Sequence, residues 1–146
     1  MTNKINLLLA DDDIDDRQFF DMALQEIPLS TQLKTVENGQ RLMDFLKDNE
    51  SELPFAIFLD INMPRKTGTE CLVAIKNDQK LKHIPIIMYS TSLHYDVVDL
   101  LYEKGAHYYL QKPGVLELSK AINKILLNLM ENPQRPSRKS FVVKDW

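Results

Sequence analysis

Cysteine is nearly absent from this chain, which has a single one, Cys71, among 146 residues. One thiol cannot form an internal disulfide, and no basic leader with a small-residue cleavage site precedes the first apolar segment, so we expect a reducing, cytoplasmic environment. Long apolar runs are missing as well. The longest, at residues 5–10 and 55–59, fall far short of the roughly 20 residues that a membrane-spanning helix needs. The sequence therefore predicts a protein that does not span a membrane.

An excess of charge of one sign is also lacking, since 18 basic residues stand against 21 acidic ones and the net charge is −3. This balance gives no reason to expect binding to nucleic acid or to anionic lipid. With 44% apolar and 27% charged residues, the composition is that of a folded domain and not of a disordered chain. The length fits one domain of ordinary size, so we expect no second catalytic domain.

Short apolar segments alternate with amphipathic ones along the chain. Continuous apolar runs at 5–10, 55–59 and 86–89 predict strands that are buried on both faces, and the more mixed segments at 32–36 and 107–110 predict strands at the edges of a sheet. Between and after these strands, apolar residues at helical spacing predict five helices. This alternation predicts a doubly wound α/β domain with a five-stranded parallel sheet and right-handed crossovers.

The pattern ends at about Glu131. Residues 132–140 carry no apolar face, and residues 141–146 form a short apolar terminus. We therefore assign residues 1–131 to one domain and residues 132–146 to a flexible C-terminal tail, most simply a solvated basic arm. The histidines at 83, 94 and 107 lack the spacing of metal ligands, and we expect them at the surface or at helix ends.

Polar residues follow the predicted strands where each one ends. In chain order they are Asp11, Asp12 and Asp13 after the first strand, Asp60 after the third, Ser90 after the fourth and Lys112 after the fifth. Ligands of parallel α/β sheets bind beyond the carboxyl ends of the strands. If the first and third strands are neighbours, about 4.8 Å apart, the carboxylates of Asp11, Asp12 and Asp60 share one small pocket.

Crowded carboxylates repel each other and favour binding of a cation. An all-oxygen site open to solvent suits Mg²⁺, which keeps several waters and accepts a phosphate oxygen. The Lys112 ammonium and the Ser90 hydroxyl would complete a site for a phosphoryl group. Asp60 can then be the nucleophile and form an aspartyl phosphate. Each residue alone has a simple structural explanation, but four such residues rarely coincide at four strand ends.

These residues resemble a known family, the receiver domains of two-component response regulators. The resemblance runs from about residue 4 to residue 130. It is carried by LLLADDD at 7–13, ENG at 37–39, FLDINMP at 58–64 with Gly68 and Glu70, IPIIMYS at 84–90, and Gly105-Ala106 before YLQKP at 109–113. It implies a stand-alone receiver with a flavodoxin-like sheet of strand order 2-1-3-4-5 and five flanking helices.

The resemblance also implies a role for individual residues. Asp60 is identified as the phospho-acceptor, and Asp11, Asp12 and the backbone carbonyl of Asn62 as further ligands of Mg²⁺, with Mn²⁺ as an alternative ion. Ser90 is the switch hydroxyl, Lys112 is the lysine of the catalytic site, and Tyr109 is the aromatic switch that turns inward on phosphorylation. Lys112-Pro113 resembles a corner where the family has a cis proline.

The function implied is that of a phosphorylatable switch, which catalyses only its own phosphorylation and dephosphorylation and is not an enzyme in the usual sense. The phosphoryl group would come from a phosphohistidine of a histidine kinase or a histidine phosphotransfer protein. Only about 15 residues follow the last predicted helix, too few for an output domain, so the target is another protein. We expect it to bind the fourth helix, fifth strand and fifth helix, with the receiver a monomer or a phosphorylation-dependent dimer.

Two departures and two alternatives remain. Ser90 stands where threonine is commoner in the family, and Thr91 stands where alanine or glycine is frequent. One alternative is a Mg²⁺-dependent phosphohydrolase of similar fold, which needs a second aspartate two residues after the nucleophile, where Asn62 stands. The other is a degenerate receiver that only binds, which the intact Asp60, Asp12 and Lys112 disfavour.

Overall fold

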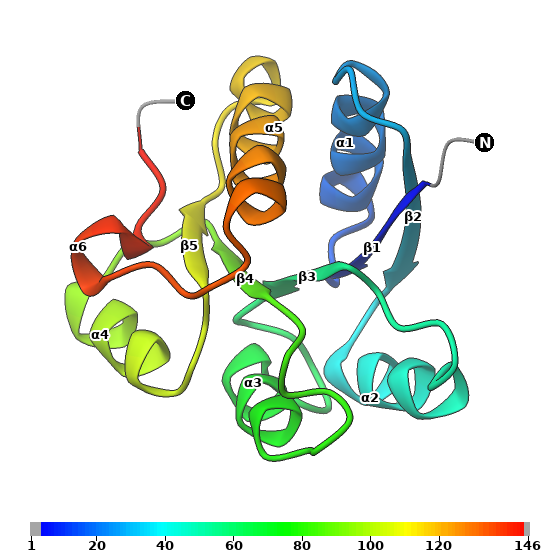
Figure 1. The fold of residues 1–146 in the computed structure, drawn as a ribbon, viewed down its shortest axis with the longest axis vertical. Helices are drawn as coiled ribbons and strands as arrows, with labels where there is room; N and C mark the ends of the chain where they lie inside the picture. The colour runs from blue at the N-terminus through cyan, green and yellow to red at the C-terminus, as the bar shows by residue number, and fades with distance from the viewer. Residues whose placement is uncertain (1–3, 145–146) are drawn as a thin grey trace.

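Five parallel strands form the centre of the molecule, in the order β2-β1-β3-β4-β5 (Figure 1). The computed structural model describes residues 4–144. The strands are β1 (Ile5–Ala10), β2 (Thr31–Val36), β3 (Ala56–Asp60), β4 (Ile86–Ser90) and β5 (Tyr108–Gln111). Each neighbouring pair runs parallel. This arrangement confirms the predicted doubly wound α/β fold and its strand order.

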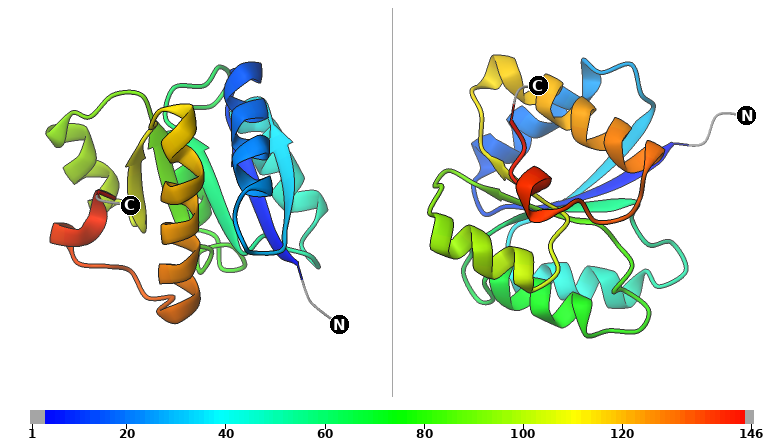
Figure 2. Two further views of the ribbon diagram at one scale, coloured as in Figure 1. Left: turned by 90° about the horizontal axis from the view of Figure 1, so that it is seen from above. Right: turned by 60° about the vertical axis from the view of Figure 1, so that its left-hand side comes forward.

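The helices cover the two faces of the sheet. They are α1 (Ile14–Gln25), α2 (Gly39–Asp48), α3 (Gly68–Lys76), α4 (Tyr95–Glu103), α5 (Val115–Glu131) and the short α6 (Arg138–Phe141). Helices α1 and α5 pack on one face, and α2, α3 and α4 pack on the other (Figures 1 and 2). No helix within residues 4–144 is long and apolar enough to cross a membrane.

The apolar runs predicted these strands because consecutive side chains point to opposite faces of a sheet. In β1, Leu7 and Leu9 pack beneath α1 and α5, whereas Leu8 and Ala10 pack beneath the helices of the other face. Every residue of β3 and β4 is buried, but β2 has only exposed and partly buried positions. A strand that is buried on both sides must be apolar throughout, and an edge strand need not be.

The C-terminal tail, residues 132–144, differs from the solvated arm that we expected. Phe141 is completely buried and Val143 is 8% exposed. Val142 pairs with Tyr109 in a parallel bridge, and the Val143 N–H donates to the Tyr109 carbonyl oxygen at 2.9 Å. Phe141 packs with the core on the α4 side, and Val143 packs with the core on the α5 side, so the tail crosses the free edge of β5. The backbone N–H and C=O groups of that edge have no neighbouring strand, and the tail supplies hydrogen-bond partners for them.

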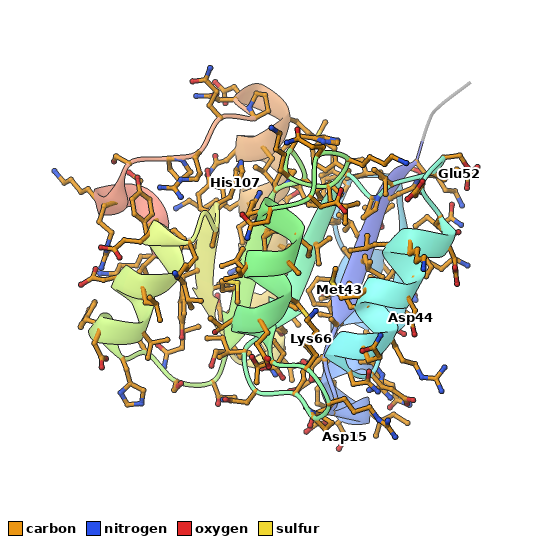
Figure 3. All side chains as sticks on the ribbon, turned by 90° about the horizontal axis from the view of Figure 1, so that it is seen from below. Asp15, Met43, Asp44, Glu52, Lys66 and His107 are labelled. Atoms are coloured by element: carbon orange, nitrogen blue, oxygen red, sulfur yellow. The ribbon has the colours of Figure 1, made fainter. Side chains whose placement is uncertain are left out.

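His107 also differs from its expected surface position, since it is only 8% exposed. It precedes β5, and its Nε2 lies 3.3 Å from the carbonyl oxygen of Pro133 in the tail. Figure 3 places it at the end of the sheet opposite to Asp15, which lies in the first turn of α1. The ring is therefore covered by the tail, which the sequence did not indicate.

Candidate functional site

Acidic residues from two neighbouring strands meet at the carboxyl end of the sheet. Asp11 and Asp12 follow β1, Asp60 is the last residue of β3, and each offers a carboxylate oxygen within 4.8 Å of the others. Asp11 and Asp60 are buried, whereas Asp12 is exposed. The structure thus brings together the three carboxylates that the strand order predicts, and it leaves one side of the cluster open to solvent.

Lys112 reaches into this cluster from the end of β5. Its Nζ donates to Asp11 Oδ2 at 2.9 Å and lies 3.5 Å from Asp60 Oδ2. A third partner is Asp16 in the first turn of α1, whose Oδ2 accepts from the same ammonium at 2.8 Å. Sequence reasoning missed Asp16, because nothing local to residue 16 distinguishes it from the other aspartates of that turn. Lys112 reaches these partners although the described chain has no cis peptide bond, in contrast to the cis bond implied for Pro113.

The site shifts the pKa values of two of its groups, Lys112 and Asp60. Burial opposes the charged form of Lys112, but hydrogen bonds to Asp16 and Asp11 outweigh it and raise the pKa of the ammonium above its ordinary value. The pKa of Asp60 is raised from 3.8 to about 6, chiefly by burial and in addition by Asp11 and Asp12, against the lowering effects of Lys112 and the Asn62 N–H. Asp60 is therefore a carboxylate whose negative charge is only partly compensated.

The backbone after each strand holds the carboxylates in place. The Asp13 N–H donates to Asp11 Oδ1 at 3.0 Å, and the Asn62 N–H donates to Asp60 Oδ1 at 3.3 Å. At the start of α3, a Cβ on Gly68 would lie 2.1 Å from the Asp60 carbonyl oxygen, so only glycine allows this approach. Asn62 lies in the loop between Asp60 and Gly68, where the resemblance requires a metal-binding carbonyl.

Ser90 ends β4, one residue beyond Tyr89, which pairs with Asp60 of β3, and is 1% exposed. Its Oγ accepts a hydrogen bond from the Ser92 N–H at 3.3 Å. The Ser92 carbonyl oxygen in turn accepts from the Tyr109 hydroxyl at 2.6 Å. We expected Tyr109 to turn inward only on phosphorylation, but its ring is already fully buried. A continuous path of contacts therefore leads from the end of β4 to β5.

The donor set fits a hard divalent cation. The Lys112 ammonium contacts the carboxylates of Asp11, Asp16 and Asp60, and Asp12 adds a further carboxylate to the cluster, so negative charge remains in excess. Carboxylate oxygens and a solvent-open side are what Mg²⁺ prefers, since it keeps several of its waters. The described residues thus offer ligands for the ion at Asp11, Asp12 and Asp60.

Comparison with known proteins agrees with this geometry. The response regulator Rcp1 of a Synechocystis species is 33% identical over 110 residues, which span 73% of this chain and 75% of that protein. The histidine kinase P4 of Formosa agariphila contains a matching segment, 38% identical over 97 residues, which covers 64% of this chain and 7% of the kinase.

Solved structures show the same likeness. The phosphorylated cyanobacterial phytochrome response regulator RcpA superposes with a TM-score of 0.81 at 28% identity, covering 92% of this chain and 100% of that one. The Mn²⁺-bound form of Rcp1 superposes with a TM-score of 0.76 at 30% identity, covering 90% and 99%. The family model of the response regulator receiver domain matches residues 7–123. With this fold, this cluster of acidic residues and these relatives, the chain belongs to the family of response regulator receiver domains.

Proposed function

We propose that this chain is a phosphorylatable switch in which Asp60 accepts a phosphoryl group from a phosphohistidine, with Mg²⁺ bound at Asp11, Asp12 and Asp60. The observation that carries the proposal is the position of Asp60, within 4.8 Å of two other carboxylates and 3.5 Å from the Lys112 ammonium. A nucleophilic carboxylate, a cation site and a fixed positive charge are the parts that phosphoryl transfer needs.

In the proposed reaction, an Asp60 oxygen forms a bond to phosphorus while the phosphorus–nitrogen bond of the phosphohistidine breaks. The electron pair of that bond stays on the imidazole nitrogen. Bound Mg²⁺ would neutralise part of the charge on the phosphoryl oxygens. Lys112 stabilises the charge of the product without making or breaking a bond, and the Ser90 hydroxyl donates to a phosphoryl oxygen. Loss of the phosphoryl group to water returns the switch to its starting state.

Turnover of small phosphate esters finds no support at this site. A phosphohydrolase with an aspartyl phosphate needs a general acid two residues after the nucleophile, and the Asn62 amide at that position is too weak an acid to protonate a leaving group. The receiver relatives are signalling switches, which agrees with a single phospho-acceptor. The proposed donor is a histidine kinase or a histidine phosphotransfer protein, and the proposed target is a protein in the cytoplasm.

The proposal is tested by treating the chain with phosphoramidate and Mg²⁺ and measuring intact mass. We expect one added phosphoryl group on the wild type, mapped to Asp60, and none on Asp60→Asn, because an amide is a far weaker nucleophile than a carboxylate. Lys112→Ala should still be phosphorylated, but slowly. The exposed Asp15 offers a matched control, since Asp15→Asn removes a nearby charge without touching the cluster. A phosphoryl group on Asp11, Asp12 or a histidine would contradict the assignment.

Metal binding is tested separately with Asp12→Ala. Since this carboxylate is one of three that converge, its loss should weaken Mg²⁺ binding by about tenfold or more in a calorimetric titration. Asp15→Asn again serves as the control and should bind Mg²⁺ like the wild type. Undiminished binding by Asp12→Ala would remove Asp12 from the set of ligands.

A further inference from the structure

The C-terminal tail lies on the surface through which we expect the receiver to signal. We call the exposed side of α4, β5 and α5 the output face. Helix α6 lies beside α4, and the strand-like segment that follows it lies along β5 (Figure 1). The Lys124 ammonium of α5 also donates to the Lys144 carbonyl oxygen at 2.6 Å. A partner that approached the output face would therefore meet the tail first.

Polar contacts hold the first half of the tail on α4. The Arg135 guanidinium stacks 3.8 Å from the centre of the Tyr102 ring and donates to the Tyr102 carbonyl oxygen at 2.6 Å. The Tyr102 hydroxyl donates to the Pro136 carbonyl oxygen at 3.1 Å. Arg138 Nε donates to Asp99 Oδ1 at 2.7 Å. Two cations of the tail are thus paired with α4, Arg138 with the Asp99 carboxylate and Arg135 with the Tyr102 ring. Ion pairs and cation–π contacts of this kind are also used to recognise bound peptides.

The second half of the tail is held by burial and by backbone pairing. The Phe141 ring lies edge-on to two tyrosines, with its centre 5.2 Å from that of Tyr102 and 6.3 Å from that of Tyr109. The next two residues pair with the backbone of Tyr109 itself. An extended segment that adds to a sheet edge and inserts a side chain into a pocket is a recurring mode of peptide recognition.

Tyr109 connects the tail to the proposed phosphorylation site. Its ring forms one wall of the Phe141 pocket, and its hydroxyl donates to the Ser92 carbonyl oxygen. The Ser92 N–H in turn donates to Ser90 Oγ. If the Ser90 hydroxyl turns toward a phosphoryl oxygen on Asp60, the loop that carries Ser92 loses this contact. The Tyr109 ring and the wall of the Phe141 pocket are then free to move.

We propose that residues 133–144 are an internal ligand of the output face, which must leave before a partner binds and which phosphorylation of Asp60 loosens. The proposal rests on the function proposed above, because it uses the same phosphorylation site. It also defines the partner by its chemistry. To replace the tail, the partner offers one helical turn with a basic residue for Asp99 and, three positions later, an aromatic ring for the pocket between Tyr102 and Tyr109, followed by an extended segment that pairs with β5.

The proposal is tested with the full chain by hydrogen exchange, with and without beryllium fluoride and Mg²⁺, which together mimic a phosphoryl group on a carboxylate. We expect amides of residues 140–144 to exchange at least fivefold faster with the mimic. Arg138→Gln, which breaks the ion pair with Asp99, should give faster exchange without the mimic. Lys139→Gln is the matched control, since Lys139 has the same charge and is exposed. Tail exchange that the mimic leaves unchanged would overturn the proposal.

A labelled peptide of residues 134–144, added in trans, tests occupancy of the output face. It should bind Phe141→Ala, in which the tail loses its buried ring, at least tenfold more tightly than it binds the unmodified wild type. The mimic should not produce this gain in the wild type, because a pocket that holds the tail less tightly also holds the same segment less tightly in trans. Equal binding to Phe141→Ala and to the unmodified wild type would overturn the proposal, and so would a dimer of the unmodified wild type held together by exchanged tails.

The two proposals fail in different ways. If intact mass shows no phosphoryl group on Asp60, the proposed function is wrong. Peptide binding to Phe141→Ala and hydrogen exchange of Arg138→Gln then still show whether the tail occupies the output face. If Asp60 is phosphorylated and the tail nevertheless keeps its slow exchange, only the role of the tail is overturned.

Discussion

At Asp60, the proposed reaction and the stability of the fold make opposite demands. The reaction needs an anionic oxygen near a cation site, yet burial and two neighbouring carboxylates raise the pKa of this group to about 6. Lys112 compensates only part of this cost, because Asp11 and Asp16 hold its ammonium closer to themselves than to Asp60. The charge that makes Asp60 a nucleophile therefore destabilises the metal-free protein.

Replacing Asp60 with asparagine should consequently stabilise the metal-free protein. A pKa that rises from 3.8 to about 6 corresponds to about 3 kcal/mol at neutral pH, since one unit is worth about 1.4 kcal/mol. We expect Asp60→Asn to raise the free energy of unfolding by about 1–3 kcal/mol at pH 7 in EDTA, as measured by urea denaturation. The asparagine side-chain oxygen can still accept from the Asn62 N–H.

The stability difference between Asp60→Asn and the wild type should depend on pH. Between pH 3.8 and about 6, the folded wild type binds more protons than the unfolded chain, so its stability falls as the pH rises through that window. The advantage of Asp60→Asn should therefore vanish below about pH 4. Millimolar Mg²⁺ should also reduce it, because the ion stabilises only the carboxylate form. A variant that is less stable than the wild type at pH 7 in EDTA would contradict this account.

At the scale of the elements, the approach of α3 to the end of β3 positions the site. Gly68 begins α3, and its N–H donates to the Ile61 carbonyl oxygen at 2.8 Å. Thr67 and Glu70 close a capping box around the same turn. The loop that carries Asn62 is thus fixed at both ends, by the strand before it and by the helix cap after it. Its position depends on the missing side chain of Gly68.

Gly68→Ala should displace this loop. The new Cβ would lie 2.1 Å from the Asp60 carbonyl oxygen, a backbone atom that cannot move alone. We expect the free energy of unfolding to fall by about 2 kcal/mol or more, and Mg²⁺ binding to weaken, in urea denaturation and calorimetry. Gly114→Ala is the control, since nothing lies within 4 Å of its Cβ position, and it should change stability by about 0.5 kcal/mol or less. Similar losses in both variants would show that close approach is not the cause.

The elements show which features a sequence can predict. Strands β3 and β4 could be recognised because burial on both faces requires unbroken apolar runs, and Thr67 and Glu70 marked the start of α3 through their spacing. Asp16 could not be recognised, because its partner Lys112 is 96 residues away and only the fold brings them together. The docked tail was missed because Phe141 and Val143 pack on opposite faces of the sheet. Their side chains therefore form no periodic apolar pattern that would predict a helix or a strand.

At the scale of the whole molecule, the tail links the two ends of the sheet. It starts at the amino ends of the strands, where His107 contacts the Pro133 carbonyl oxygen, and it runs along β5 toward the carboxyl ends. Burial, Lys76 and Arg135 together lower the pKa of His107 to about 4, against the raising effect of the Pro133 carbonyl. Burial and Arg135 likewise lower the pKa of Lys76 to about 8. Protonation of His107 is therefore unfavourable in the folded protein, so acidification should lower the free energy of unfolding.

His107→Gln should make the stability of the molecule less sensitive to acid. The unfolded histidine takes up a proton near pH 6.5 and the folded one only near pH 4, so wild-type stability falls as the pH drops through this window. Between pH 7 and pH 5, the wild type should lose about 2 kcal/mol more than His107→Gln in urea denaturation. His83→Gln changes an exposed histidine and should follow the wild type. If the free energy of unfolding fell equally with pH in the wild type and in His107→Gln, His107 would not be held neutral beneath the tail.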